Sequence, residues 1–105
     1  MLRVTVVSTD GHVTLKLEGS LTGPWVHELE RSWLAVAGTA SMESIRIDLT
    51  DVGFVDGEGQ ALIENMAGAG VKLIAAGPMM KGLVADVLSR IRKKQKASGG
   101  GHHAA

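Results

Sequence analysis

A strand–helix–strand pattern in the middle of the chain restricts the possible folds more than any other feature. Residues 45–49 alternate apolar and polar side chains, as a strand covered on one face does. A helical pattern follows over about 57–69, and 71–76 is a second short apolar strand that ends at Gly77-Pro78. Two strands joined by a helix pair in parallel through a right-handed crossover. The sequence therefore predicts an α/β fold built around a parallel strand pair.

The N-terminal part of the chain predicts a β-hairpin. Alternating apolar residues occur over 2–7 and again over 12–18, and Asp10-Gly11 separates the two runs. Asp-Gly is one of the dipeptides that two-residue hairpin turns prefer. We therefore expect two antiparallel strands here, with Val13, Leu15 and Leu17 on the covered face.

Two further helices complete the expected fold. One starts near Pro24 and ends near Gly38, with Trp25 and Trp33 on its apolar stripe, where we interpret them as core residues. The other follows the last strand and carries apolar residues at helical spacing from 80 to 91. The expected architecture is a single α/β domain, a mixed and mostly parallel sheet of about four strands with three helices packed against it.

Composition narrows the class of protein. The 105 residues carry 11 cations and 11 carboxylates, so no overall field favours nucleic acid or an anionic membrane. The absence of cysteine excludes disulfides and thiol chemistry. No apolar run approaches the ~20 residues of a membrane span, and no secretory leader is apparent. We expect a cytoplasmic protein without membrane insertion, with one domain at 1–96 and a disordered glycine-rich tail at 97–105.

Four carboxylates lie together in the middle of the sequence, at Asp48, Asp51, Asp56 and Glu58. Carboxylates at the end of a strand can hold Mg²⁺, so one hypothesis is a Mg²⁺-dependent phosphoryl-transfer or nucleotide-binding protein. Local structure offers another interpretation. Asp56 is placed to cap the following helix, and Glu58 to complement its dipole. The chain has no P-loop, dinucleotide-binding or nucleophile-elbow motif. We therefore predict no enzyme activity, no catalytic residue, no metal and no cofactor.

Several remaining polar residues are interpreted as structural or solvated. His12 lies beside the hairpin turn, and His27 lies in the first turns of a helix without a catalytic partner in the sequence. The cations between Arg90 and Lys96 suit a helix C-terminus. His102-His103 is only a weak signal for adventitious metal.

The same central stretch resembles a known family. The residues Asp48-Leu49-Thr50, Val52 and Phe54-Val55-Asp56-Gly57-Glu58-Gly59 resemble the signature of the STAS domain, named for sulfate transporters and anti-sigma-factor antagonists. Gly19-x-Leu21 and the order of elements are also similar, and the resemblance covers about Leu2 to Ser89. It implies a bacterial regulator of transcription that acts by protein–protein interaction in signal transduction. Its partner would be a kinase-like anti-sigma factor.

The resemblance also implies a docking site. It places the docking loop at Asp56, Gly57, Glu58, Gly59 and Gln60, together with the adjoining helix face. In the family, the second serine of an Asp-Ser-Ser-Gly segment accepts a phosphate that blocks partner binding. The resemblance also leaves open an alternative function, an accessory module of a lipid or solute transporter complex.

This chain departs from the family at that serine pair, where it has Gly57 and Glu58. Glu58 aligns with the phospho-acceptor and has no hydroxyl to modify. A carboxylate supplies about one negative charge, against roughly −1.5 to −2 for phosphoserine. Glu58 either mimics the modified state or marks a protein that docks without a switch. Thr22 replaces an acidic residue common in relatives, and Thr50 is the nearest alternative hydroxyl.

The C-terminal region departs from the family as well. Relatives commonly add a strand and a helix after the helix that here spans 80–92. This chain instead enters its cationic run and glycine-rich tail. We expect the strand that starts at Val71 to form an open sheet edge, which would allow pairing in a homodimer.

Overall fold

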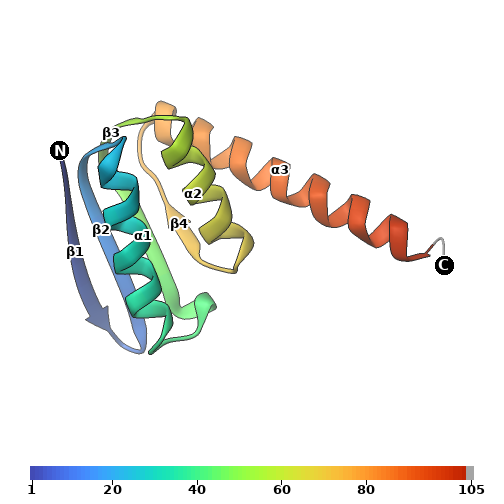
Figure 1. The fold of residues 1–105 in the computed structure, drawn as a ribbon, viewed down its shortest axis with the longest axis horizontal. Helices are drawn as coiled ribbons and strands as arrows, with labels where there is room; N and C mark the ends of the chain where they lie inside the picture. The colour runs from blue at the N-terminus through green and yellow to red at the C-terminus, as the bar shows by residue number, and fades with distance from the viewer. Residues whose placement is uncertain (104–105) are drawn as a thin grey trace.

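The computed structural model describes the backbone of residues 1–103 and the side chains of residues 1–94. Within them the chain forms four strands, three α-helices and one short 3₁₀-helix (Figure 1). In chain order the elements are β1 (Leu2–Thr9), β2 (His12–Leu21), α1 (Pro24–Ala37), η1 (Met42–Ser44), β3 (Ile45–Val55), α2 (Gly57–Gly68), β4 (Lys72–Ile74) and α3 (Pro78–His103).

The strands form one sheet in the order β1-β2-β3-β4. β1 and β2 are antiparallel, and their two-residue turn has positive φ at both Asp10 (49°) and Gly11 (80°), as the favoured hairpin turn requires. β2 pairs in parallel with β3, and β3 with β4. The predicted hairpin, the predicted strand–helix–strand unit and the α/β class are confirmed.

β3 is longer than the sequence analysis expected. Residues 50–55, which lie beyond the strand predicted at 45–49, continue the strand and pair with β2 as far as Leu21. Two register shifts, between Lys16 and Glu18 and between Gly19 and Ser20, interrupt the ladder. These irregularities break the alternation of apolar and polar residues, so the pattern failed to indicate a strand beyond Leu49.

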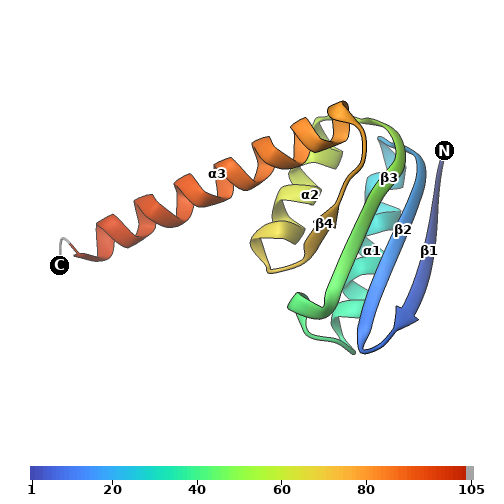
Figure 2. The same cartoon turned by 180° about the vertical axis from the view of Figure 1, so that it is seen from behind.

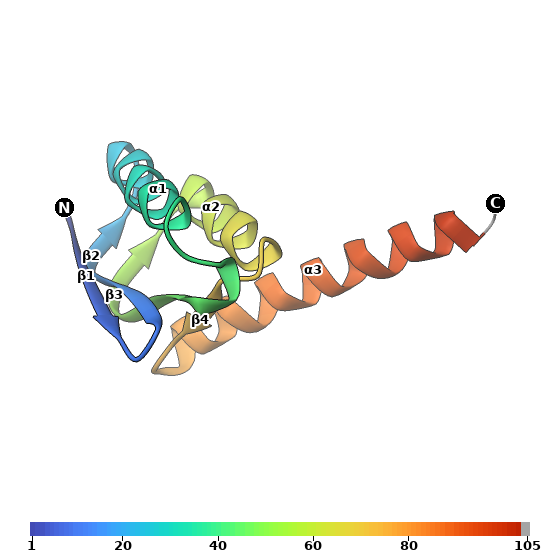
Figure 3. The same ribbon diagram turned by 90° about the horizontal axis from the view of Figure 1, so that it is seen from below.

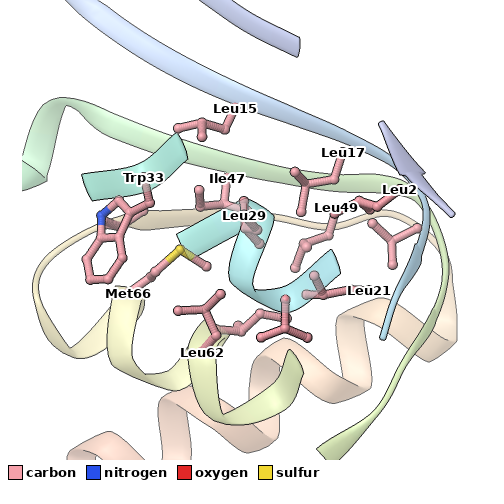
Figure 4. Close-up of a cluster of buried hydrophobic side chains, with 14 of the residues drawn as sticks. Leu2, Leu15, Leu17, Leu21, Leu29, Trp33, Ile47, Leu49, Leu62 and Met66 are labelled. Atoms are coloured by element: carbon pink, nitrogen blue, oxygen red, sulfur yellow. The ribbon is translucent and has the colours of Figure 1, made fainter. Parts of the chain in front are cut away.

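The core lies between the sheet and the two helices α1 and α2. Figure 3 shows both helices on the same side of the sheet, and Figure 4 shows the side chains between them. Figure 2 shows the opposite face of β1, β2 and β3 without a helix in front of it. Trp33 is buried and Trp25 packs against the core, which confirms their predicted role. The fully buried residues with large side chains are Leu15, Leu17, Leu21, Leu29, Ile45, Ile47, Leu49, Ile63, Met66 and Val87.

α3 packs against α2 and contacts β3 rather than covering the sheet face. It buries Met80 and Val87, and its outer part projects from the body of the molecule (Figure 1). The helical backbone continues to His103, beyond the boundary expected at residue 96. Residues 104–105 lie outside the described residues, as do the side chains of His102 and His103. The division of the chain at residue 97 stays a prediction.

Both edges of the sheet can be identified within the described residues. β1 forms one edge over eight residues, and β4 forms the other over only three. The strand expected at 71–76 therefore does lie at an edge. It is shorter than expected, because Val71 and residues 75–76 fall outside the ladder.

Candidate docking site between α1 and α2

Asp56 joins the starts of two helices that are far apart in sequence. It follows β3 directly and caps α2, as its position predicts, with Oδ1 accepting the N–H of Gly59 at 2.8 Å. Its Oδ2 accepts the N–H of Gly23, the residue before α1, at 3.0 Å. One carboxylate therefore satisfies backbone donors at the beginnings of both α1 and α2.

These two hydrogen bonds also stabilise the charged form of Asp56. The N–H of Gly59, and after it the N–H of Gly23, hold the pKa of this carboxyl below its ordinary value of 3.8. Partial burial acts in the opposite direction but does not outweigh them. Asp56 is therefore fully ionised at neutral pH and serves the fold, although the resemblance places it in the docking loop.

Two glycines make this arrangement possible. Gly23 has a φ of +52°, in the left-handed region where residues with a Cβ are strained. Gly59 is buried, and a Cβ there would lie 2.7 Å from the backbone oxygen of Leu21 and 2.8 Å from Cγ1 of Val55. The first turn of α2 can therefore approach the end of β2 only because residue 59 is glycine.

Glu58 is presented outward by the same turn. Its neighbours in sequence differ in environment: Gly57 is exposed, Gly59 is buried and Gln60 is half-buried. Glu58 lies at a shallow groove of about 220 Å³ between α1 and α2. The residues lining this groove, hereafter the α1–α2 groove, are Val26, His27 and Glu30 from α1 and Glu58, Ala61, Leu62 and Asn65 from α2.

The α1 side of the α1–α2 groove was not predicted from the sequence, whereas its α2 side belongs to the helix that adjoins the predicted docking loop. Of its lining, only Glu58 belongs to the predicted docking loop, and the sequence interpretation of His27 was a structural or solvated residue. The order of elements does contain information about this groove. The helices α1 and α2 each follow one strand of a parallel pair, so both start at the carboxyl ends of these strands. Their first two turns therefore lie close enough to share a groove.

The four carboxylates considered as a metal site are held by separate partners. Asp48 accepts hydrogen bonds from the backbone N–H of Thr50, at 2.9 Å, and from its hydroxyl. Asp51 lies 3.9 Å from Nζ of Lys16. The carboxylate of Asp56 accepts hydrogen bonds from the N–H groups of Gly23 and Gly59, and Glu58 lines the α1–α2 groove. Among the described residues, no group of three potential ligands is arranged to hold a metal ion.

The other singled-out residues lie away from the groove or contribute little to it. Thr50 is exposed, while Thr22 and His12 are half-buried. Nδ1 of His12 is buried without a hydrogen-bond partner among the described residues. Neither threonine lines the α1–α2 groove.

The similarity of this chain to known proteins was found by comparing structures and not by comparing sequences. No protein-family model matches the chain, and no curated protein sequence matches it significantly. A solved anti-sigma factor antagonist from Mycobacterium paratuberculosis superposes with a TM-score of 0.65 at 20% identity, covering 88% of this chain and 95% of that one. A DUF3478-family protein from Shewanella loihica with a SpoIIAA-like fold gives 0.50 at 17% identity, over 75% and 71%. This chain has the SpoIIAA-like fold.

A similar arrangement also matches part of one longer chain. The structure of Mglu matches with a TM-score of 0.52 at 18% identity, covering 70% of this chain but 19% of that one. The likeness to the anti-sigma factor antagonist extends over nearly the whole of both chains, which agrees with the STAS resemblance of the sequence. Among the described residues, no helix is both long enough and apolar enough to cross a bilayer.

Proposed function

We propose that this chain is a non-catalytic protein-interaction module, an anti-sigma-factor-antagonist-like regulator. Its docking face would comprise the loop Asp56–Gln60 and the α1–α2 groove. One observation carries the proposal: Asp56 and Gly59 fix the start of α2 so that Glu58, the phospho-acceptor equivalent, stands exposed at a groove with an apolar floor.

The chemistry of the groove favours recognition over catalysis. Its floor is formed by the buried Val26 and Leu62, the exposed Ala61 also lines it, and its titratable groups are His27, Glu30 and Glu58. An apolar floor with a few polar groups at the rim is what an interface hot spot requires. The separate partners of Asp48, Asp51 and Asp56 give no support to the Mg²⁺ alternative.

Under this proposal, the charge at position 58 is set by the amino acid itself and not by phosphorylation. With no hydroxyl at this position, the docking face cannot be switched by phosphate on residue 58. Residue 58 contributes about one negative charge through its carboxylate, less than a phosphoserine would. The partner we propose is a kinase-like anti-sigma factor in the cytoplasm, by analogy with the antagonist that shares the fold.

Affinity capture followed by titration tests this proposal. The wild-type chain and a Glu58→Arg variant would be used as baits in lysate of the native cell, with Glu43→Arg as the control, since Glu43 is exposed and outside the groove. We expect an anti-sigma factor to be enriched by the wild type and the control but not by Glu58→Arg. Equal recovery with Glu58→Arg would contradict the docking face.

The role of Glu58 is then resolved with the purified partner and two substitutions, Glu58→Ser and Glu58→Ala. If Glu58 mimics phosphoserine, Glu58→Ser binds more tightly than the wild type. If Glu58 is a direct contact, both variants bind at least about tenfold more weakly, the loss that one charge-assisted hydrogen bond gives. Unchanged affinity in both variants would remove Glu58 from the mechanism.

A further inference from the structure

The formal charges of this neutral chain are segregated between its helices. α1 and α2 together carry Glu28, Glu30, Glu58 and Glu64 against the single cation Arg31, which pairs with Glu28. The described side chains of α3 reverse this balance, with Asp86 as the only carboxylate. Its cations are Lys81, Arg90, Arg92, Lys93 and Lys94. One molecule therefore presents an acidic helix pair and a basic helix.

α3 has an exposed stripe that matches the α1–α2 groove in chemistry. Lys81, Ala85, Leu88 and Arg92 follow at spacings of four, three and four, so they share one side of the helix. All four are exposed, Leu88 to 44%. The stripe is about 16 Å long and has an apolar centre with a cation at each end.

The groove offers the complementary arrangement. Its floor is apolar, and Glu58 in the first turn of α2 and Glu30 in the second turn of α1 place a carboxylate on each helix. Neither carboxylate has an ion-pair partner among the described residues. Leu88 would cover the floor, while Lys81 and Arg92 would reach the two carboxylates.

The two surfaces of one molecule do not meet each other. Glu64 on α2 lies 3.6 Å from Nε of Arg90 and 3.2 Å from Nζ of Lys94, which holds α3 along the flank of α2 away from α1. Figure 1 shows α2 between α1 and α3, with α3 extending outward. The stripe is therefore available to a neighbouring molecule but not to its own groove.

We propose that the α1–α2 groove binds the α3 stripe of a second copy of this chain. Such a contact joins different surfaces on the two molecules, so it can be made twice in a reciprocal two-fold pair or repeated in rings and open chains. The inference does not depend on the proposed function. If both hold, self-association and partner docking compete for the same groove. The contact is small, so the association is weak and sensitive to salt.

Sedimentation velocity on the purified chain tests the proposal directly. At about 20 mM salt we expect the weight-average sedimentation coefficient to rise with concentration between about 10 µM and 1 mM, the range expected for a small interface. At about 500 mM salt the rise should be largely abolished because exposed charges are screened. A wild-type chain that remains monomeric throughout the low-salt series would overturn the proposal.

Charge reversal identifies the surfaces. The groove variant Glu30→Lys/Glu58→Lys and the helix variant Lys81→Glu/Arg92→Glu should each fail to self-associate, and their equimolar mixture should associate again. Circular dichroism verifies that each variant is folded, and recovery in the mixture shows that neither has lost its other surface. Failure of the mixture to associate, with both variants folded, would contradict the contact.

A matched variant separates this contact from a net-charge effect. Arg3→Glu/Lys72→Glu changes the formal charge as the helix variant does, at exposed positions on β1 and β4. We expect it to self-associate as the wild type does. If it loses association to the same extent as the helix variant, the α3 stripe is not the contacting surface.

Discussion

At the scale of single residues, the proposed docking face depends on two positions that contact the fold itself. Asp56 satisfies the N–H groups of Gly59 and Gly23, and Gly59 leaves room for the end of β2. Both residues were placed in the docking loop by the sequence resemblance. Their surroundings give them a structural role, which the resemblance could not separate from that of Glu58.

Replacement of Asp56 by asparagine should destabilise the domain in a pH-dependent way. Asparagine can accept with one oxygen only, so one of the two N–H groups loses its acceptor. At pH 7 we expect the Tm to fall by about 4–8 °C, the change that loss of one cap produces in a domain of this size. Thermal melts followed by circular dichroism measure the change.

The pH profile of those melts provides the check. Because the pKa of Asp56 is lowered in the folded chain, its contribution to stability is fully present above its unfolded pKa. That contribution is lost as the pH falls through the lowered folded value. The Tm difference between wild type and Asp56→Asn should therefore be constant above about pH 5 and shrink below about pH 4. A difference that persists unchanged into acid would show that ionisation of Asp56 is not involved.

Two alanine substitutions in α2 should have opposite effects. Gly59→Ala places a Cβ 2.7 Å from the backbone oxygen of Leu21, so it should cost about 1–3 kcal/mol despite the higher helix propensity of alanine. Gly68→Ala meets no atom within 4 Å and should stabilise the domain by up to ~1 kcal/mol. Denaturant unfolding of the two variants tests the pair. Equal effects would mean that the close approach at Gly59 is relieved at no cost.

At the scale of elements, α3 is attached differently from α1 and α2. Those helices cover one face of the sheet, whereas α3 packs against α2 and β3, buries Met80 and Val87, and forms ion pairs with Glu64 of α2. The sequence predicted the apolar stripe of α3 correctly. It could not specify which surface the stripe covers, because periodicity identifies a buried face without identifying its neighbour.

Glu64→Gln should loosen the outer part of α3 selectively. The glutamate side chain is only 20% exposed and faces Arg90 and Lys94, but both cations are more exposed, so the loss should be about 0.5–1 kcal/mol. Hydrogen exchange should become faster over residues 88–94 while the amides of β3 keep their protection. Glu43→Gln, at an exposed site on η1, is the control. Faster exchange throughout the sheet would instead indicate global destabilisation.

At the scale of the whole molecule, the sequence predicted the layout well where local patterns are regular. Alternation at 45–49, the Asp10-Gly11 turn and the helix before β4 together led to the observed four-stranded sheet. Two features of the structure were not predicted from the sequence. The register shifts in the β2–β3 ladder hid the second half of β3. The α1–α2 groove was not predicted because it depends on the spacing between two helices, and the sequence of a single segment does not determine that spacing.

The free edge of the sheet also belongs to this scale. β1 is an eight-residue edge strand on which Val6 and Val7 are 51% and 45% exposed. Apolar edge strands promote association of partly unfolded chains. Val7→Lys should raise the onset temperature of aggregation, measured by light scattering, while changing stability by less than ~0.5 kcal/mol. Thr5→Lys, two residues away on the same face, is the control and should have a smaller effect. An unchanged onset for Val7→Lys would exclude this edge as the route.

The contacts at the start of α2 also determine which substitutions the proposed docking loop can accept. Positions 56 and 59 are fixed by the contacts of Asp56 and by the space around Gly59. Positions 57 and 58 are exposed, and a Cβ added at Gly57 would meet no atom within 4 Å. Serine, glycine and glutamate are therefore interchangeable at 57 and 58 without rebuilding the turn. If the proposed docking face holds, a protein with this architecture can pass from a switchable surface to a permanently charged one through changes at two exposed positions in the first turn of α2.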